Sequence, residues 1–409
     1  MSIPNAPQLH VPEPPARPGE KANFSKLDIP KAGTLARPSP HAPEIELRDY
    51  PYGMVRVLDR EGAAKGEWDP GLTADQLRKG LHAMLKTRIF DDRMFRLQRQ
   101  GKTSFYMKCL GEEAIGTAQS LVLSKDDMCF PTYRMLTWLM ARDYPLDDLV
   151  NQIFSNEKDP LKGRQLPILY SARDYGFYSV SGNLGSRFGH AVGWAMAAAY
   201  RGDDRIALGC VGEGTTAEGN FHESLTFASV YKAPVILTVT NNQWAISSYS
   251  GFAGGDATTF AAKALAYGLP GLRVDGNDFL AVWAATQWAR ERALAGYGAT
   301  LIEYYTYRMA GHSTSDDPTK YRCEDEAEHW PLGDPIERLK AHLITIGEWD
   351  DGQHEALAND IQMEIRAAVR KGEKIGTLGR SKPPVGEMFE GVFEEPDWRV
   401  QEQRRELGV

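Results

Sequence analysis

Two residue types that bind hard cations stand just beyond two apolar runs of the sequence. Glu213 follows the run at 205–211, and Asn242 follows the run at 235–240. Each run has the length and composition of a buried strand in a parallel sheet. The carboxyl ends of neighbouring parallel strands meet at one edge of a sheet, where ligands bind. Because carboxylate and amide oxygens are ligands that Mg²⁺ accepts, the pattern predicts a metal site at this edge.

The residues around Glu213 favour an anion beside that cation. Gly212 and Gly214 let the backbone approach a ligand closely. We expect a helix over 215–231 with Thr215 as its N-cap, so that its free N–H groups point to the same place. Mg²⁺ needs about six oxygen ligands, which two protein side chains, a backbone carbonyl, two phosphate oxygens and a water would supply. The pattern therefore predicts a metal–diphosphate site.

The elements that must position these residues alternate along the chain. Apolar runs and helical periodicity predict strands over 128–130, 205–211, 235–240, 272–274 and 300–305 and helices over 75–100, 112–122, 189–200, 215–231, 279–295, 334–346 and 354–371. The helix over 189–200 is small and apolar all round, which predicts burial on every side. Alternating strands and helices predict an α/β fold with a doubly wound, mostly parallel sheet flanked by helices.

The two ends of the chain differ from its middle. Residues 1–45 are rich in proline, which cannot donate to a backbone ladder, so we expect an extended arm that is either disordered or wrapped over a partner. Residues 46–345 are expected to form the main domain. Residues 346–409 are expected to form a helical extension and a polar tail with four apolar side chains: Met388, Phe389, Phe393 and Trp398.

Composition excludes several classes of protein. A net charge of -8 over 409 residues gives no electrostatic footprint for nucleic acid or an anionic membrane. No apolar run approaches the ~20 residues of a spanning helix, and the N-terminus has no targeting pattern, so we expect a cytoplasmic protein. The four cysteines are far apart and form no CxxC pair, which indicates neither a zinc site nor a disulfide framework.

The wider pattern resembles a thiamine-diphosphate-binding motif, in which GDG precedes a helix, a strand and then NN. Here GEG stands at 212–214 and NN at 241–242, with Glu213 where many relatives have Asp. Glu is longer by one methylene but keeps the carboxylate. Further segments resemble the alpha subunits of branched-chain 2-oxo acid dehydrogenases, over most of the chain from about residue 50: SFYM at 104–107, GEE at 111–113, YR at 133–134, RDYPL at 142–146 and HSTSDD at 312–317.

This resemblance implies an activity and partners. Members of that family oxidatively decarboxylate the 2-oxo acids derived from Val, Leu and Ile. Two alpha and two beta chains form the enzyme, which passes the acyl group to a lipoyl-bearing dihydrolipoyl acyltransferase. A glutamate from a second domain activates the aminopyrimidine ring of the cofactor. No second sheet pattern follows residue 310, so we expect the beta chain to supply that glutamate and this chain alone to be inactive.

The resemblance also implies roles for single residues. Glu213, the side-chain oxygen of Asn242 and the main-chain carbonyl of Trp244 would ligate Mg²⁺. Thiamine diphosphate would be held by Tyr133, Arg134, Gly182, Leu184, Gly212, Glu213, Gly214, Thr215, Asn242 and His312. Leu184 would support the bent shape of the cofactor. His312, in a polar loop rich in turn formers, would be catalytic and assist acyl transfer.

Two departures from the family pattern are visible. Thr240 replaces an arginine that precedes NN in mammalian members, so we expect one phosphate contact fewer. Asn183 and Arg187 alter a potassium-binding loop, so we predict no potassium ion. Ser313 matches a serine that is phosphorylated in mammalian relatives, but nothing in the sequence indicates a kinase for this chain.

Three alternative functions stay open at this stage. Alpha subunits of pyruvate or acetoin dehydrogenase share the same cofactor residues, and only SFYM and HSTSDD favour branched-chain substrates. A nicotinamide-dependent oxidoreductase would need GxGxxG after a strand, which GEGTTAEG at 212–219 fits poorly. A catalytically silent scaffold subunit would not need Glu213 and Asn242.

Overall fold

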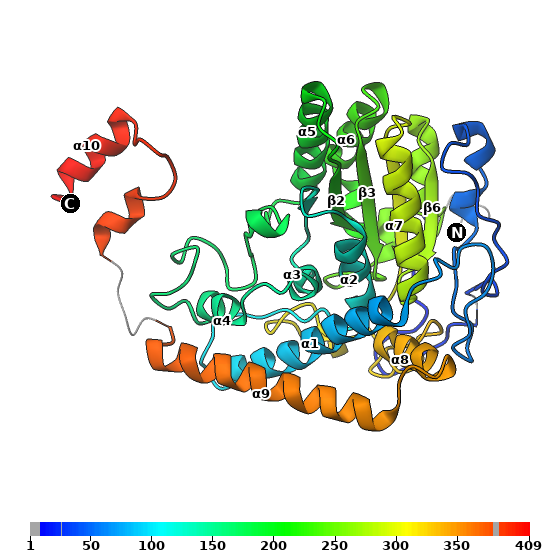
Figure 1. The fold of residues 1–409 in the computed structure, drawn as a ribbon, viewed down its shortest axis with the longest axis horizontal. Helices are drawn as coiled ribbons and strands as arrows, with labels where there is room; N and C mark the ends of the chain where they lie inside the picture. Colours follow the sequence, from blue (N-terminus) through cyan, green and yellow to red (C-terminus); the bar gives the residue numbers. More distant parts are fainter. Residues whose placement is uncertain (1–8, 26, 379–383) are drawn as a thin grey trace, which may run out of the picture.

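A computed structural model describes residues 9–25, 27–378 and 384–409. Within these residues the centre of the chain is a parallel sheet with the strand order β1-β2-β3-β7-β6 (Figure 1). The strands are β1 Met128–Phe130, β2 Ala207–Gly212, β3 Val235–Asn241, β6 Gly271–Asp275 and β7 Thr300–Tyr305. A short hairpin of β4 (Trp244–Ala245) and β5 (Ser248–Tyr249) follows β3. The predicted α/β fold is confirmed.

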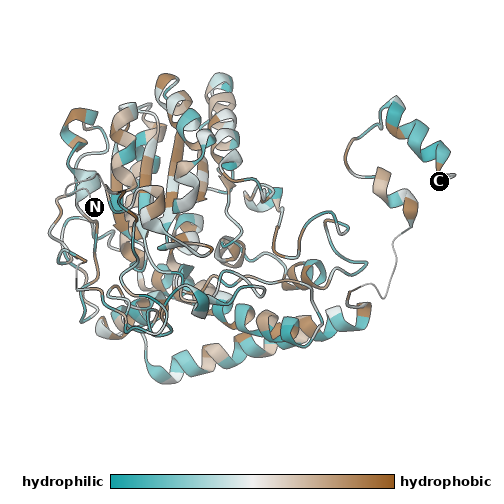
Figure 2. Ribbon diagram, turned by 180° about the vertical axis from the view of Figure 1, so that it is seen from behind, coloured by the Kyte–Doolittle hydropathy of each residue, from teal (hydrophilic) through white to brown (hydrophobic). Residues whose placement is uncertain are grey.

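Helices cover both faces of the sheet and create two cores. One face carries α2 (Glu113–Val122) and α7 (Phe279–Leu294), and the other carries α5 (Ser186–Arg201), α6 (Gly219–Val230) and the 3₁₀ segment η6 (Ala261–Tyr267). Successive side chains of β2 alternate between them: Leu208 and Cys210 enter the first core, whereas Ala207 and Val211 enter the second. The strands are therefore buried on both faces, as their continuous apolar runs predicted. Figure 2 shows them as a strongly hydrophobic part of the chain.

A second layer of helices supports the sheet from below in Figure 1. Helix α1 (Ala74–Arg99) begins at a capping box of Thr73 and Gln76 and packs against α2, α8 and α9. The remaining elements are α3 Leu136–Ala141, α4 Leu146–Phe154, α8 Pro335–Thr345, α9 Asp351–Ile375, α10 Trp398–Glu406, η1 Glu44–Leu47, η2 Tyr50–Tyr52, η3 Arg173–Tyr175, η4 Glu213–Ala217, η5 Ser250–Ala253, η7 Pro318–Lys320 and η8 Val385–Phe389. None of the helices in the described ranges is long and apolar enough to cross a membrane.

The described part of the N-terminal arm packs on the chain's own main domain. Trp288 of α7 donates its indole N–H to the carbonyl of Pro38 at 2.9 Å. Arg292, one helical turn further on, donates to the carbonyls of Pro40 at 2.8 Å and Ala42 at 2.7 Å. We expected an arm that is either disordered or wrapped over a partner; these residues of the arm pack on donors of this chain, and a contact with a partner stays a prediction. Residues 1–8 and 26 of the predicted arm lie outside the described residues.

Two of the sequence predictions are wrong in detail. The helix predicted over 215–231 begins only at Gly219, because Glu218 is extended (φ −83°, ψ 146°) and Thr216 donates its hydroxyl back to the carbonyl of Glu213 at 2.8 Å. Thr215 therefore lies in the 3₁₀ turn η4 and is not an N-cap. Helix α5 is not buried on every side, since Tyr200 on its outer face is 94% exposed. Its small residues mark a face that this chain alone does not cover.

The C-terminal tail lies away from the main domain (Figure 1). It comprises η8 and α10, and α10 is mostly hydrophilic in Figure 2. Three of its predicted apolar side chains are exposed, Met388, Phe393 and Trp398. Arg164 of the body donates to the carbonyl of Glu387 in the tail at 2.6 Å, and the ammonium of Lys162 lies 3.5 Å from the carboxylate of Glu390. Residues 379–383 of the predicted C-terminal extension lie outside the described residues.

Candidate active site

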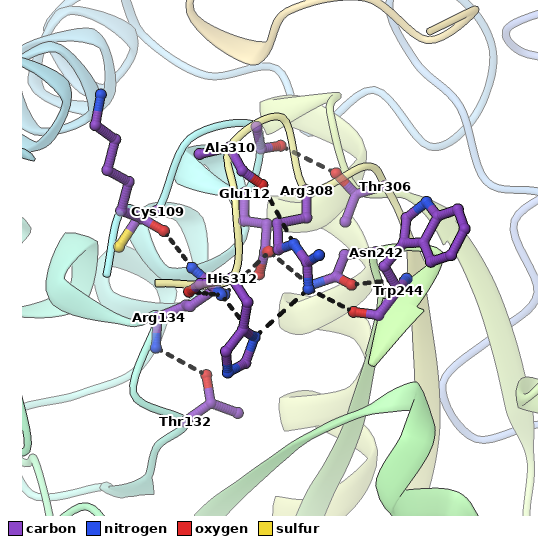
Figure 3. A network of polar contacts seen from close by, with 12 residues as sticks. Cys109, Glu112, Thr132, Arg134, Asn242, Trp244, Thr306, Arg308, Ala310 and His312 are labelled. Carbon is purple, nitrogen blue, oxygen red and sulfur yellow. Dashed lines mark hydrogen bonds and ion pairs between the residues drawn. The ribbon is translucent and has the colours of Figure 1, made fainter. Parts of the chain in front are cut away.

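The predicted site residues meet in one cavity of about 490 Å³ at the carboxyl ends of β2 and β3. Every residue predicted to bind the cofactor or the metal lines it: Tyr133, Arg134, Gly182, Leu184, Gly212, Glu213, Gly214, Thr215, Asn242, Trp244 and His312. The structure adds side chains to which the sequence assigned no role there: Glu112, Thr132, Arg187, Thr240, Ala245, Ile246 and Arg308. Figure 3 shows the polar contacts that join several of them.

Glu213 is a buried carboxylate with one oxygen atom that lacks a hydrogen-bond partner. It follows β2 directly, and its Oε1 atom has no hydrogen-bond donor in the described chain. Burial raises its pKa to about 7, and the nearby carboxylate of Glu112 adds to this, while its own N–H, the guanidinium of Arg308 and the N–H of Asn242 oppose it. A buried polar atom without a partner costs free energy. A divalent cation at Glu213 would remove that cost, so the carboxylate fits a metal ligand.

Asn242 and Trp244 offer two more oxygen atoms at the end of β3. The Asn242 amide donates through Nδ2 to Glu112 at 2.7 Å, and its Oδ1 accepts the backbone N–H of Trp244 at 3.3 Å. The Trp244 carbonyl accepts from Arg308 at 2.9 Å and keeps a second lone pair. No group of three or more His, Cys, Asp or Glu in the described chain could hold a metal ion by itself. The residues predicted to supply metal ligands therefore line one cavity, and their binding of a metal ion stays a prediction.

Arg134 joins the end of β1 to the loop that carries His312. Its Nη1 donates to the carbonyl of Lys108 at 2.6 Å, and its Nη2 donates to the carbonyl of His312 at 2.5 Å. The guanidinium is almost wholly buried. The ring of Tyr133 meets the His312 imidazole edge to face, with centroids 5.7 Å apart. An always-charged planar donor in this position suits a phosphate.

The imidazole of His312 is held in its neutral form. Burial lowers its pKa to about 3, and the positive charges of Arg134 and Arg308 add to that shift. Its Nδ1 lies 3.2 Å from Nη2 of Arg134 and 3.5 Å from Nη1 of Arg308. Because both neighbours can only donate, Nδ1 is the acceptor and the ring proton lies on Nε2. His312 can therefore donate one hydrogen bond without carrying charge.

Hydrogen bonds tie the loop around His312 to the body. Asp316 accepts the backbone N–H of His312 and the hydroxyl of Tyr321, both at 2.6 Å. Thr314 and Tyr106 form a reciprocal pair, in which Thr314 donates its N–H at 2.9 Å and receives that of Tyr106 at 3.0 Å. The polar loop that the sequence predicted is thus ordered by contacts on both sides.

Three of the seven added residues, Ile246, Arg308 and Arg187, bring apolar surface or positive charge to the cavity. Ile246 is 55% exposed and has the left-handed φ of 58°, which is strained for a β-branched residue. Arg308 donates to the carbonyl of Ile246 at 2.8 Å, and only its position four residues before His312 hinted at a role. Arg187 is buried, and its Nε has no partner in the described chain. Asn183, the other altered loop residue, does not line the cavity.

Comparison with known proteins identifies the family. Residues 81–379 match the model of the dehydrogenase E1 component. The chain belongs to this family. Residues 5–43 also match the model of the N-terminal segment of the 2-oxoisovalerate dehydrogenase E1 alpha subunit. Membership confirms the predicted fold and class of enzyme, implies thiamine diphosphate as the cofactor, and removes the nicotinamide-dependent alternative.

Similar chains occur in bacteria and eukaryotes. The chain is 54% identical to the 2-oxoisovalerate dehydrogenase subunit alpha of Pseudomonas aeruginosa over 98% of each chain. It is 36% identical to the mitochondrial 2-oxoisovalerate dehydrogenase subunit alpha of Mus musculus, over 87% of this chain and 79% of the relative. It is 35% identical to the mitochondrial subunit alpha 1 of Arabidopsis thaliana, over 95% of this chain and 81% of the relative.

Proposed function

We propose that this chain is the alpha subunit of an enzyme that oxidatively decarboxylates branched-chain 2-oxo acids and passes the acyl group to a lipoyl-bearing acyltransferase. The names of its relatives support this substrate class. The observation that carries the proposal is the buried Oε1 atom of Glu213, which has no hydrogen-bond partner in the described chain and lines the same cavity as Asn242 and Arg134. These groups suit a divalent cation bound to a diphosphate.

The chain's own groups divide into metal and phosphate ligands. Mg²⁺ would be held by the Glu213 carboxylate, the Asn242 side-chain oxygen and the Trp244 carbonyl. The diphosphate would be held by Arg134, Tyr133, His312 and the backbone N–H groups of Gly214 and Thr215. Thr240 brings no positive charge, but Arg187 and Arg308 line the same cavity, which supports anion binding without an arginine at 240.

The remaining residues prepare the cavity for the reaction. When bound, thiamine diphosphate supplies the electron sink for the loss of carbon dioxide. His312 offers a neutral N–H donor to an acyl or phosphate oxygen. Leu184 and Ile246 give the cavity an apolar wall that excludes water from the reacting groups, and Gly182 beside Leu184 leaves room for the cofactor.

The open wall of this cavity supports a second subunit. Leu184 is 48% exposed, although it lines the cavity. A separate hollow of about 530 Å³ lies along α5 and α6, lined by small residues such as Gly189 and Gly193 and by Phe227. Tyr200, Val230 and Tyr231 extend the exposed apolar face. We assign this face to a beta subunit, which would complete the site within an α2β2 heterotetramer.

The domain organisation follows from this assignment. Residues 1–45 would act as an arm, residues 46–345 as the diphosphate-side domain and residues 346–409 as a helical extension with a partner-docking tail. The exposed Met388, Phe393 and Trp398 support docking by the tail. We further propose that the protein acts in the cytoplasm and binds neither nucleic acid nor membrane.

Co-expression with a beta subunit tests the proposed function. The assembled enzyme should transfer acyl groups from 2-oxoisovalerate to a lipoylated acyltransferase domain, whereas this chain alone should not. Pyruvate and acetoin serve as competing substrates in the same assay. A strong preference for either would move the chain to another branch of the family. A double Glu213→Ala, Asn242→Ala variant that still takes up thiamine diphosphate would overturn the site.

A further inference from the structure

The side-chain amide of Asn242 is fixed at both of its ends (Figure 3). Its Nδ2 donates to Oε1 of Glu112 at 2.7 Å. Its Oδ1 accepts the backbone N–H of Trp244 at 3.3 Å. An amide has nearly the same shape when it is rotated by half a turn, but rotation exchanges a donor for an acceptor. Only the oxygen end can ligate a cation, so the orientation of this amide decides whether Asn242 can act as a metal ligand.

Glu112 is suited to set that orientation. An ionised carboxylate accepts hydrogen bonds and donates none, so it pairs only with the Nδ2 end of Asn242. Its side chain is 6% exposed and lies at the entry to α2, far along the sequence from β3. We propose that Glu112 is a positioning residue, which occupies the donor end of Asn242 and leaves its oxygen available to the divalent cation. This inference rests on the proposed function of the site.

The same carboxylate reaches the phosphate side of the cavity. Oε1 of Glu112 lies 3.8 Å from Nε of Arg134, whose Nη2 binds the His312 carbonyl. One buried oxygen atom therefore lies between an amide assigned to the metal and a guanidinium assigned to the diphosphate. A shift of Glu112 would disturb both, which links the geometry of the two ligand sets.

The next residue offers a matched comparison. Glu113 is also buried and is also a carboxylate, but it pairs with Arg88 at 2.7 Å and accepts the backbone N–H of Gly111 at 2.8 Å. Glu113 does not line the cavity. Two successive acidic residues thus have different surroundings: Glu113 holds the start of α2, and Glu112 lines the cavity.

The test measures cation binding rather than turnover. In the assembled alpha–beta enzyme with thiamine diphosphate, Mn²⁺ affinity is read by electron paramagnetic resonance. Glu112→Gln should weaken it by about 10- to 100-fold, as changes behind metal ligands do, because a glutamine can donate to the wrong end of Asn242. Glu113→Gln should leave it unchanged, and Glu112→Asp should bind better than Glu112→Gln because it can still only accept. Unchanged affinity in Glu112→Gln, or an equal loss in Glu113→Gln, would overturn the inference.

Replacing Asn242 by Asp should reverse the effect of Glu112→Gln on Mn²⁺ affinity. With Asn242→Asp, residue 242 has no donor end, and its carboxylate repels that of Glu112. Adding Glu112→Gln then supplies a donor, so it should strengthen Mn²⁺ binding in this background although it weakens binding beside Asn242. Weakening in both backgrounds would indicate general damage and refute the positioning role. If the unsubstituted enzyme bound no divalent cation with the cofactor, the proposed function itself would fail, which is a separate outcome.

Discussion

Arg134 contacts both the backbone and the ring of His312. Its Nη2 donates to the His312 carbonyl at 2.5 Å and lies 3.2 Å from Nδ1 of the imidazole. The two residues are 178 positions apart in the sequence. The pair fastens the loop to the end of β1 and places a fixed positive charge beside the imidazole. His312 is consequently presented to the cavity as a neutral donor.

His312 should not titrate near its ordinary pKa of about 6.5. With a pKa of about 3, the folded chain leaves the ring neutral while the unfolded chain protonates it, so this residue lowers stability as pH falls from about 6.5 to 3. NMR of histidine-labelled protein without cofactor should show one ring unchanged between pH 5 and 8, assigned by its loss in His312→Gln. Arg134→Met should raise that pKa. A His312 ring that titrates normally would contradict the geometry.

Glu213→Gln should separate cofactor binding from folding. The substitution removes a buried charge whose Oε1 atom has no hydrogen-bond partner in the described chain, so stability of the cofactor-free protein should not fall. Binding of thiamine diphosphate with Mg²⁺, measured by calorimetry on the assembled enzyme, should weaken by about 100-fold or more. Glu218→Gln, at an exposed position of the same segment, is the control. A Glu213→Gln protein that unfolds more easily yet binds normally would refute the assignment.

Asp91 should make stability fall as pH rises. It accepts the Tyr106 hydroxyl at 2.7 Å and the Cys109 N–H at 2.6 Å, and burial raises its pKa to about 7. Between its unfolded pKa of about 3.9 and its folded pKa of about 7, the folded chain keeps a proton that the unfolded chain has lost. The free energy of unfolding therefore falls as pH rises through that window.

Asp91→Asn removes this proton and one acceptor, at a cost of about 1–3 kcal/mol. The stability difference from the unsubstituted protein should therefore be larger at pH 5 than at pH 8, as measured by denaturant unfolding. Asp92→Asn, which removes a half-exposed partner of Lys108, provides the control. A difference that is constant with pH would contradict the raised pKa.

Gly193 should tolerate a methyl group but not a large side chain once the partner is bound. A Cβ atom there would meet nothing within 4 Å in this chain. In this chain without its partner, Gly193→Ala should raise the free energy of unfolding by up to about 1 kcal/mol, because alanine favours a helix more than glycine does. Gly193→Leu should leave this chain folded and reduce its co-purification with the beta subunit. Ala356→Leu, on the exposed side of α9, is the control, because it places a leucine at an exposed helix position elsewhere. Normal assembly of Gly193→Leu would move the interface away from α5.

The strand ends could be predicted from the sequence because burial on both faces leaves continuous apolar runs. Glu213 and Asn242 follow such runs and belong to neighbouring parallel strands, so their meeting needed no further information. The start of α6 could not be predicted, because the Thr216 hydroxyl competes locally with the helix and Glu218 stays extended.

Contacts between distant segments could not be predicted from the sequence, for a different reason. Glu112 and Asn242 are 130 positions apart, and no local pattern states that a carboxylate before α2 will meet the turn after β3. The outer face of α5 was taken for a buried one, because small apolar residues have the same composition whether their own chain or another covers them. Ile246 gave no signal, since its left-handed backbone becomes visible only in coordinates.

The way in which α7 receives the arm bears on how the protein can be shortened. Proline has no N–H to give, so the arm brings acceptors and the helix must bring donors: Trp288 and Arg292 supply them, and Glu44 meets the Arg292 charge at 2.8 Å. The side chain of Arg292 is fully buried with the arm in place. A version trimmed to the main domain would remove the acceptors of both the Arg292 guanidinium and the Trp288 indole. It would therefore expose unpaired polar groups on α7 and be less stable than the full chain.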